Sequence, residues 1–346
     1  MSSQKVKKGI DRREFLRSTA ALGAGVVLAP KSFGQAAGSG PDDINVALLG
    51  AGAQGQVLLN TCLKIPGVRF KAVCDIWTAY NQKRVSRLLK KYRHEHNTYV
   101  DYQEMLDKEK DLDAVLIATP DFWHTEHTVA CLKAGLDVYC EKEMSNTLEG
   151  ARKMVQAVKE AGKLLQIGHQ RRSNPRYIHC CEKLIKEAKL LGRITTINGQ
   201  GYFETFMGDE GTLVISESAG RGAVYREPSA PEWDKWVKAG YVNEPALQPR
   251  LATRVAAARK KEEKPETGAV LDVRETMAPP AYELPVKMEK LYHQPHLENF
   301  FDAIRGKAKL NCPVEIGYKT AVTILKVNEA VEAARRLDFK PGEFTA

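Results

Sequence analysis

The feature that most constrains the fold is a short apolar run followed at once by a glycine-rich motif. Residues 44–49 (INVALL) are typical of a buried β-strand, and GAGAQG follows them at 50–55. Apolar residues at helical spacing come directly after the motif. A strand, a G-x-G-x-x-G turn and a helix in this order predict the first unit of a dinucleotide-binding fold.

Each part of the motif has a physical role in such a unit. Gly50 makes the tight turn, Gly52 lets the backbone approach a pyrophosphate, and Gly55 permits close packing of the helix on the strand. The N-terminus of the helix, at Ala53 and Gln54, offers free N–H groups to phosphate. We therefore expect these five residues to bind the cofactor.

An acidic residue lies where a dinucleotide site needs one. A second strand, 70–74, ends in Asp75, twenty positions after Gly55. A carboxylate there accepts hydrogen bonds from the adenosine ribose hydroxyls. Ile76 and Trp77 follow, and neither side chain can pair with a 2′-phosphate. The pattern favours NAD over NADP as the cofactor.

Strand-like and helix-like segments continue to alternate up to residue 167. Apolar strand-like runs lie at 114–118, 137–140 and 163–167, with helical patterns between them. This alternation predicts a doubly wound parallel sheet, of the Rossmann type, over residues 37–167. Thr119 and Pro120 follow a buried strand at its carboxyl end, where a ligand binds in such sheets.

The first 36 residues have the pattern of an export signal. The twin arginine Arg12-Arg13 precedes an apolar stretch, 20–29, and small residues follow. The stretch is shorter than the ~18–20 apolar residues that a membrane span needs. We expect a cleaved signal of the twin-arginine (Tat) route, a periplasmic or otherwise exported protein, and no stable membrane insertion after cleavage.

Charge and cysteines exclude other classes. Of the formal net charge of +9, the signal segment holds +5, and the remaining +4 is too small to argue for nucleic acid. Seven cysteines without a C-x-x-C pair support neither a disulfide framework nor zinc. The histidine pairs 124/127 and 293/296 bring no third ligand at metal spacing, so we expect no metal.

Five segments, in the right order and spacing, make the chain similar to the Gfo/Idh/MocA family, which includes glucose–fructose oxidoreductase and inositol dehydrogenase. They are GAGAQG (50–55), CD (74–75), ATPDFWH (118–124), AGLDVYCEKE (134–143) and IGHQRRSNP (167–175). The resemblance implies a nicotinamide-dependent oxidoreductase that acts on a sugar or polyol hydroxyl. Because free NAD should be scarce outside the cytoplasm, we expect an exported protein of this kind to keep its cofactor tightly bound.

The same resemblance implies the catalytic residue. Glu141-Lys142 matches the family's E-K-P element, whose lysine lies beside the nicotinamide and the reacting hydroxyl. A lysine there could hydrogen-bond or deprotonate the alcohol as hydride leaves. Glu143 replaces the usual proline, which removes a backbone constraint and adds a carboxylate.

Further polar residues fall where the family contacts cofactor and substrate. Gln170 and Arg172 lie at the junction of the two domains, and His124 is expected to line the cofactor cleft. His169 either contacts the substrate or is a structural histidine whose hydrogen bonds are made within the junction.

Residues 168–346 predict a shortened α+β domain with an antiparallel sheet. A hairpin is expected at 203–216, a loop-dominated stretch at 228–285 and a closing helix at 296–301. The family's D-x-x-x-H element is absent after residue 170, which points to an internal deletion near residue 200, natural or from a faulty gene model. A minimised relative with another catalytic partner is the alternative. Lost strands expose new edges, which leaves homo-oligomerisation in doubt.

Three functions fit these observations. The leading one is an NAD-dependent oxidoreductase of sugars or polyols. The second is a related glycoside hydrolase that uses bound NAD for transient oxidation, recognised by a released aglycone instead of a keto-sugar. The third is a catalytically inactive NAD-binding protein, because the acid–base histidine is missing.

The export prediction has a direct test. Replacing Arg12 and Arg13 by lysine should trap the precursor in the cytoplasm, measured by cell fractionation. Unchanged export of this variant would refute the Tat assignment.

Overall fold

The computed structural model describes residues 43–200, 202–217, 222–245 and 279–345. The predicted signal segment lies outside these residues, as does most of the predicted loop stretch. None of the described helices combines the length and the apolar character that crossing a membrane requires.

The first sheet has six parallel strands in the order β3-β2-β1-β4-β5-β6. This order and the parallel pairing confirm the predicted doubly wound sheet. The strands are β1 (Ile44–Leu49), β2 (Val68–Cys74), β3 (Asn97–Tyr99), β4 (Ala114–Ile117), β5 (Asp137–Cys140) and β6 (Leu165–Ile167).

Helices cover both faces of this sheet. The helices between its strands are α2 (Ala53–Cys62), η1 (Thr78–Gln82), α3 (Lys83–Lys91), α4 (Tyr102–Lys108), α5 (Asp121–Lys133) and α6 (Leu148–Ala161). Side chains of α2 and α3 share one buried cluster with the sheet, and those of α4, α5 and α6 share another. The sheet therefore lies between two layers of helices.

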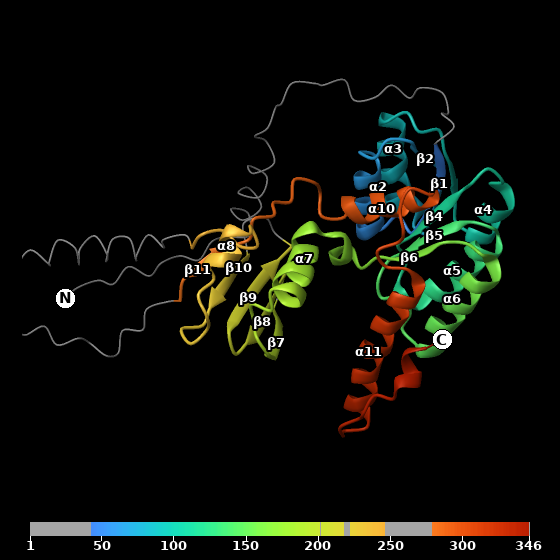
Figure 1. Cartoon of the computed structure of the whole chain (residues 1–346). Helices are drawn as coiled ribbons and strands as arrows, with labels where there is room; N and C mark the ends of the chain where they lie inside the picture. The colour runs from blue at the N-terminus through green and yellow to red at the C-terminus, as the bar shows by residue number, and fades with distance from the viewer. Residues whose placement is uncertain (1–42, 201, 218–221, 246–278, 346) are drawn as a thin grey trace, which may run out of the picture. The chain divides into compact units, whose positions relative to one another are not determined.

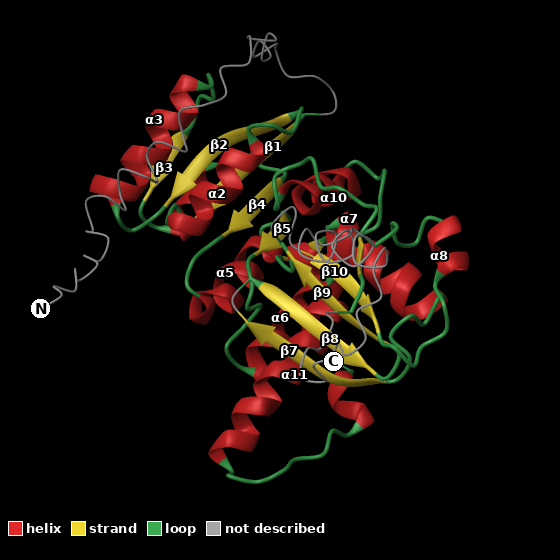
Figure 2. Ribbon diagram, turned by 90° about the vertical axis from the view of Figure 1, so that its left-hand side faces the viewer, coloured by secondary structure: helices red, strands yellow, loops and turns green. Residues whose placement is uncertain are grey.

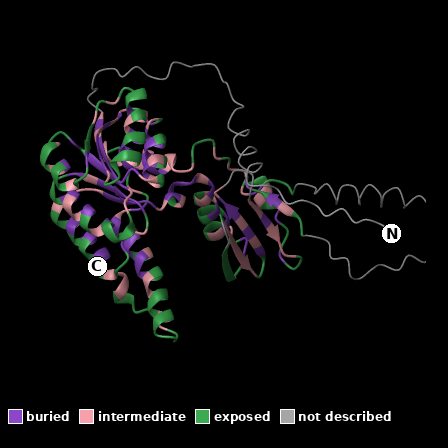
Figure 3. Ribbon diagram, turned by 180° about the vertical axis from the view of Figure 1, so that it is seen from behind, coloured by how far each residue is buried: buried purple, intermediate pink, exposed green. Residues whose placement is uncertain are grey.

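The alternation of side chains along each strand supplies both clusters. In β1, Val46 and Leu48 join one cluster, whereas Ala47 and Leu49 join the other. Successive residues of a strand point to opposite faces, so a strand buried on both sides is apolar throughout. Figure 3 shows these strands as mostly buried.

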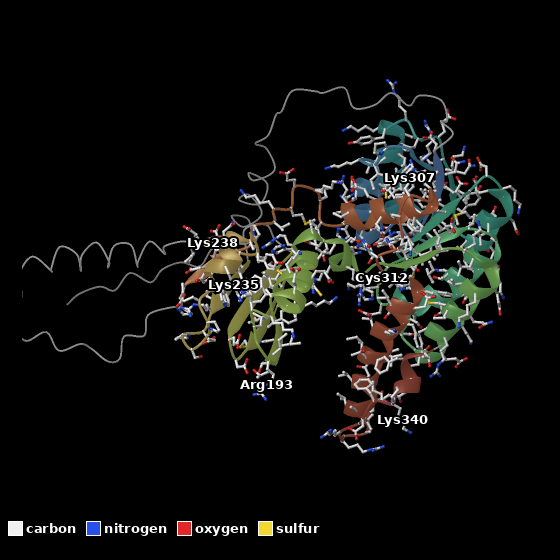
Figure 4. The ribbon with its side chains drawn as sticks, in the orientation of Figure 1. Arg193, Lys235, Lys238, Lys307, Cys312 and Lys340 are labelled. Carbon is white, nitrogen blue, oxygen red and sulfur yellow. The ribbon has the colours of Figure 1, made fainter. Side chains whose placement is uncertain are left out.

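Two C-terminal helices pack on the first sheet. Side chains of α10 (Gln294–Ile304) join the cluster of α2, and side chains of α11 (Val314–Glu332) join that of α6. Figure 1 shows α10 beside α2. Between the two helices, the carbonyl of Cys312, labelled in Figure 4, accepts a hydrogen bond from the Ile167 N–H at 3.0 Å.

This packing changes the predicted domain limits. The sequence placed everything after residue 167 in the second domain, but 294–332 complete both faces of the first. The physical reason is burial: Phe300, Phe301 and Tyr318 are at most 1% exposed within these clusters. A short 3₁₀ turn, η4 (Pro341–Phe344), follows α11.

The second sheet is antiparallel, in the order β11-β10-β9-β8-β7 (Figure 2). Its elements are η2 (Gln170–Ser173), α7 (Pro175–His179), η3 (Cys180–Glu187), β7 (Ile194–Gln200), β8 (Phe203–Gly208), β9 (Gly211–Ser216), β10 (Gly222–Arg226), α8 (Asp234–Lys238) and β11 (Ala281–Glu283). Leu184 of η3 and Trp233 are buried with the side chains of one face. The predicted hairpin is confirmed as β8 and β9.

Within the predicted loop stretch, the described parts contain two short elements. These are α8 and β11, and β11 pairs with β10. Residues 246–278 of that stretch lie outside the described residues, and so does Gly201, next to the predicted deletion point.

The packing of α10 can be tested by a truncation in its buried face. Replacing Phe300 by Ala removes a fully buried ring and should lower the free energy of unfolding by ~3–5 kcal/mol. Val331, 75% exposed at the end of α11, offers a control whose change to Ala should stay within ~0.5 kcal/mol. Denaturant unfolding measures both, and equal effects would contradict the packing.

Candidate active site

The glycine-rich loop leaves room for a ligand. Gly50 has φ +94°, and a Cβ on it would lie 2.6 Å from the backbone of Ala118. A Cβ on Gly55 would lie 2.0 Å from the Gly50 carbonyl oxygen. A Cβ on Gly52 would meet nothing within 4 Å. Helix α2 begins after Gly52, which has no capping side chain, so the loop fits a phosphate at the helix N-terminus.

Asp75 connects this loop to β2. Its carboxylate accepts hydrogen bonds from the N–H groups of Ala51 and Trp77, both at 2.7 Å, and from Asn81 Nδ2 at 3.2 Å. Asn81 Nδ2 also lies 3.3 Å from the other oxygen of this carboxylate, so a ribose hydroxyl that binds Asp75 would replace part of the Asn81 contact. The residue expected to select the cofactor also holds the glycine loop in place.

A cavity of about 1040 Å³ lies beside the loop. Gly52, Asp75, Thr119 and Pro120 line it, together with aromatic side chains that include Trp77, Phe122 and Trp123. Trp77 and Phe122 are about 60% exposed, which leaves their rings free to contact a planar base. Its size and lining suit the adenosine half of a dinucleotide.

A second cavity, of about 780 Å³, adjoins the first. Ala118 and Thr119 line both cavities, so the two cavities are neighbours. Polar and charged side chains dominate the second cavity: Gln54, Glu141, Lys142, Glu143, His169, Gln170, Arg171, Tyr202, Glu217, Tyr292 and His293.

The carboxylate of Glu141 is the centre of the hydrogen bonds in this cavity. Its Oε1 accepts from Gln54 Nε2 at 3.0 Å, from Gln170 Nε2 at 2.8 Å and from the Tyr139 hydroxyl at 3.3 Å. Its Oε2 accepts from the Lys142 N–H at 3.3 Å. Burial raises the pKa of Glu141, and the four donors favour its charged form.

Lys142 and His169 lie together in the second cavity. Burial, with the positive charges of Arg172 and Lys142, lowers the pKa of His169 to about 4. The imidazole is therefore neutral at pH 7 and offers one donor and one acceptor nitrogen. The peptide bond between Lys142 and Glu143 is cis.

Two predicted residues lie elsewhere. His124 is 1% exposed and lines neither cavity; its imidazole bridges the carbonyl oxygens of Thr119 and Glu143. His127, one helical turn later, lines the first cavity instead. Arg172 is exposed on the surface, with a nitrogen 3.4 Å from the Thr320 hydroxyl. The 3₁₀ turn η2 directs Arg171, not Arg172, into the second cavity.

The other predicted residues are brought together. Gly50 and Gly52 line the first cavity, Gln54, Glu141, Lys142, His169 and Gln170 line the second, and Thr119 lines both. Ala53 is the exposed first residue of α2. Sequence reasoning missed Arg171, Tyr202, Glu217 and Tyr292, and it considered His293 only as a metal ligand.

His293 and His296 belong to different environments. His293 Nε2 lies 3.2 Å from Gln54 Nε2 in the second cavity. His296 is fully buried between the Ile167 carbonyl and the Ser173 hydroxyl, at 2.9 and 2.6 Å. Across the described part of the chain, no three His, Cys, Asp or Glu side chains are grouped to hold a metal.

The fold and the two adjoining cavities define a Rossmann-type dinucleotide-binding domain. A family model described as "Oxidoreductase family, NAD-binding Rossmann fold" matches residues 44–169. The match confirms, over these residues, the resemblance to the Gfo/Idh/MocA oxidoreductase family seen in the sequence.

Relatives named as dehydrogenases match part of the chain. An inositol 2-dehydrogenase/D-chiro-inositol 3-dehydrogenase of Shouchella clausii is 31% identical over 146 residues, 42% of this chain and 41% of the relative. A 4-carboxy-2-hydroxymuconate-6-semialdehyde dehydrogenase of a Sphingobium species is 31% identical over 138 residues, 39% of this chain and 42% of that protein. The matches therefore span about two fifths of these relatives' length.

Solved structures share the fold of most of the chain. A levoglucosan dehydrogenase in complex with NADH and L-sorbose aligns with a TM-score of 0.61, covering 88% of this chain and 100% of that one at 13% identity. The WlbA dehydrogenase from Chromobacterium violaceum, in complex with NADH and UDP-GlcNAcA, gives 0.57, covering 87% and 97% at 15% identity. Both bear out the two-sheet fold.

The buried histidine at 296 makes the stability of the fold depend on pH. Burial lowers its pKa in the folded state from 6.5 to about 4, so below pH 6.5 the unfolded chain binds a proton that the folded chain does not. Its share of stability is therefore lost as the pH falls from 6.5 toward 4, by at most about 1.4 kcal/mol per pH unit.

Denaturant unfolding of the wild type and of His296→Gln at pH 7 and pH 5 measures this share. The variant should lose less stability between the two pH values than the wild type does. An identical loss in both proteins would show that His296 does not contribute.

Proposed function

We propose that this chain is an NAD-dependent dehydrogenase that oxidises a hydroxyl of a sugar or polyol by hydride transfer. The observation that carries the proposal is the pair of adjoining cavities, which share Ala118 and Thr119. One holds the glycine loop and Asp75, and the other holds Lys142. A dinucleotide that fills the first reaches the second.

The residues present fit the cofactor. The open space over Gly52 and the N-terminus of α2 would hold the pyrophosphate, and Asp75 would accept from the ribose. The bound dinucleotide supplies the hydride acceptor. Gln54 and Gln170 hold Glu141, and Glu141 fixes the backbone of the lysine that follows it.

Lys142 and His169 would handle the substrate's proton. Lys142 would hydrogen-bond the reacting hydroxyl and take its proton. The neutral imidazole of His169 would accept or donate one hydrogen bond to a neighbouring hydroxyl and so orient it. Because the D-x-x-x-H element is absent after residue 170, we assign the assisting role to His169, which lines the same cavity as Lys142.

The dehydrogenase names of the relatives support oxidation over the two alternatives, glycoside cleavage and cofactor binding without catalysis. We further propose NAD as the preferred cofactor, because the carboxylate of Asp75 would repel a 2′-phosphate. We also propose export by the Tat machinery with the cofactor already tightly bound, since the predicted signal precedes a domain that binds a dinucleotide.

The role of Asp75 can be tested by removing its charge. Asp75→Ala should weaken NAD binding by ~1–3 kcal/mol, the range for hydrogen bonds to charged groups, and should leave NADP binding equal or better. Calorimetry measures both dissociation constants. Asp101→Asn is the control, because it removes a carboxylate from the same cavity while retaining a good N-cap for α4.

The control should leave the NAD-to-NADP ratio of the wild type unchanged. A wild-type protein that already prefers NADP would overturn the assignment of Asp75.

The role of Lys142 can be tested in the same protein. Lys142→Ala should lower kcat by ~10²–10⁴-fold with a sugar or polyol, the range for general acid–base catalysis. Lys142→Arg keeps the charge but cannot release a proton in water, so it should lose a comparable factor. Nicotinamide absorbance measures turnover, and calorimetry verifies that NAD still binds. Full activity of either variant argues against a proton-transferring lysine.

A further inference from the structure

Arg171, which lines the second cavity, forms ion pairs with two glutamates. The Nε and Nη2 atoms of Arg171 lie 2.8 and 2.6 Å from Oε1 of Glu217, and Nη1 pairs with Glu204. The Tyr292 hydroxyl donates to the same Glu217 oxygen at 2.9 Å. Both sides of the guanidinium are therefore occupied by carboxylates.

This pairing lies where the substrate is proposed to bind. Arg171, Glu217 and Tyr292 line the cavity that contains Lys142. Its charged lining consists of two cations, Lys142 and Arg171, and three carboxylates, which belong to Glu141, Glu143 and Glu217. Arg171 is paired on both sides, whereas Lys142 forms no ion pair with a carboxylate among the described residues.

The edge of Arg171 that Glu217 occupies is the one that recognises anions. The Nε and Nη2 donors form a planar fork that matches a carboxylate or a phosphate. An acidic substrate would have to displace Glu217 from this fork and leave its carboxylate with the Tyr292 hydroxyl alone, in a cavity that also contains Glu143. An uncharged substrate needs no displacement, since its hydroxyls can donate to the Glu217 carboxylate and accept from other groups of the lining.

We propose that Glu217 is a specificity-determining residue: by holding Arg171, it makes the cavity select uncharged hydroxylated substrates over sugar acids. The inference rests on the proposed function, because it concerns the substrate of that site. The fold alone does not decide the matter, since the similar structures were solved with L-sorbose and with UDP-GlcNAcA.

The experiment compares glucose with glucuronate, which differ by one carboxylate. The NAD-loaded full chain and its Glu217→Ala variant are titrated with each sugar by calorimetry, and kcat/KM is measured with each. The wild type should prefer glucose. Glu217→Ala frees the fork of Arg171 and should shift the preference toward glucuronate by about tenfold or more.

Three variants isolate the cause. Glu143→Ala removes a carboxylate from the same cavity without freeing an arginine, so its shift should be much smaller. Adding Arg171→Gln to Glu217→Ala should abolish the gain. Glu217→Gln keeps the size of the side chain and removes its charge, so it should shift the preference in the same direction by less, which covers the case of an unstable alanine variant.

The outcomes separate this inference from the proposed function. Absence of turnover with every sugar and polyol counts against the proposed function, and binding by calorimetry still reports on Glu217. A wild type that binds glucuronate as well as glucose overturns the inference. So does a gain in Glu143→Ala equal to that in Glu217→Ala, or no gain in either Glu217 variant.

Discussion

The buried carboxylate of Glu141 is the interaction on which the rest of the site depends. A charged carboxylate can be buried only if hydrogen bonds replace the water that it loses. Here Gln54 of α2, Tyr139 of β5 and Gln170 beyond β6 donate to it. The residue thus ties the helix of the glycine loop to β5, the strand that ends just before Glu141 and Lys142. A Cβ on Gly168 would lie 2.9 Å from this carboxylate, so that position has to remain small.

The C-terminal part of the chain is joined to the same network. The imidazole of His293, just before α10, lies beside Gln54, and α10 packs on the face of the sheet that α2 covers. The cavity therefore gains Tyr292 and His293 from a segment more than 120 residues after the first domain's last strand. The packing of α10 on the first sheet therefore completes the first core and also brings Tyr292 and His293 to the site.

Much of this could be predicted from the sequence, for physical reasons. A parallel strand buried on both faces is a continuous apolar run, so β1 and β5 are found with their observed bounds, and the glycine spacing follows from close packing. An apolar helix pattern does not say which sheet the helix covers, so the return of α10 and α11 was not foreseen. Neighbours on a tight turn point in different directions, and the resemblance that predicts Arg172 does not reveal that the turn directs Arg171 into the cavity. The deletion near residue 200 stays a prediction.

The central claim is that one dinucleotide site runs from Asp75 to Lys142. A crystal structure of the full chain with NADH tests it most directly. The account predicts electron density for the adenosine ribose at Asp75, for the pyrophosphate over Gly52, and for the nicotinamide ring in the cavity with Lys142. Nucleotide density that leaves either cavity empty, or that places the nicotinamide ring away from Lys142, would contradict it.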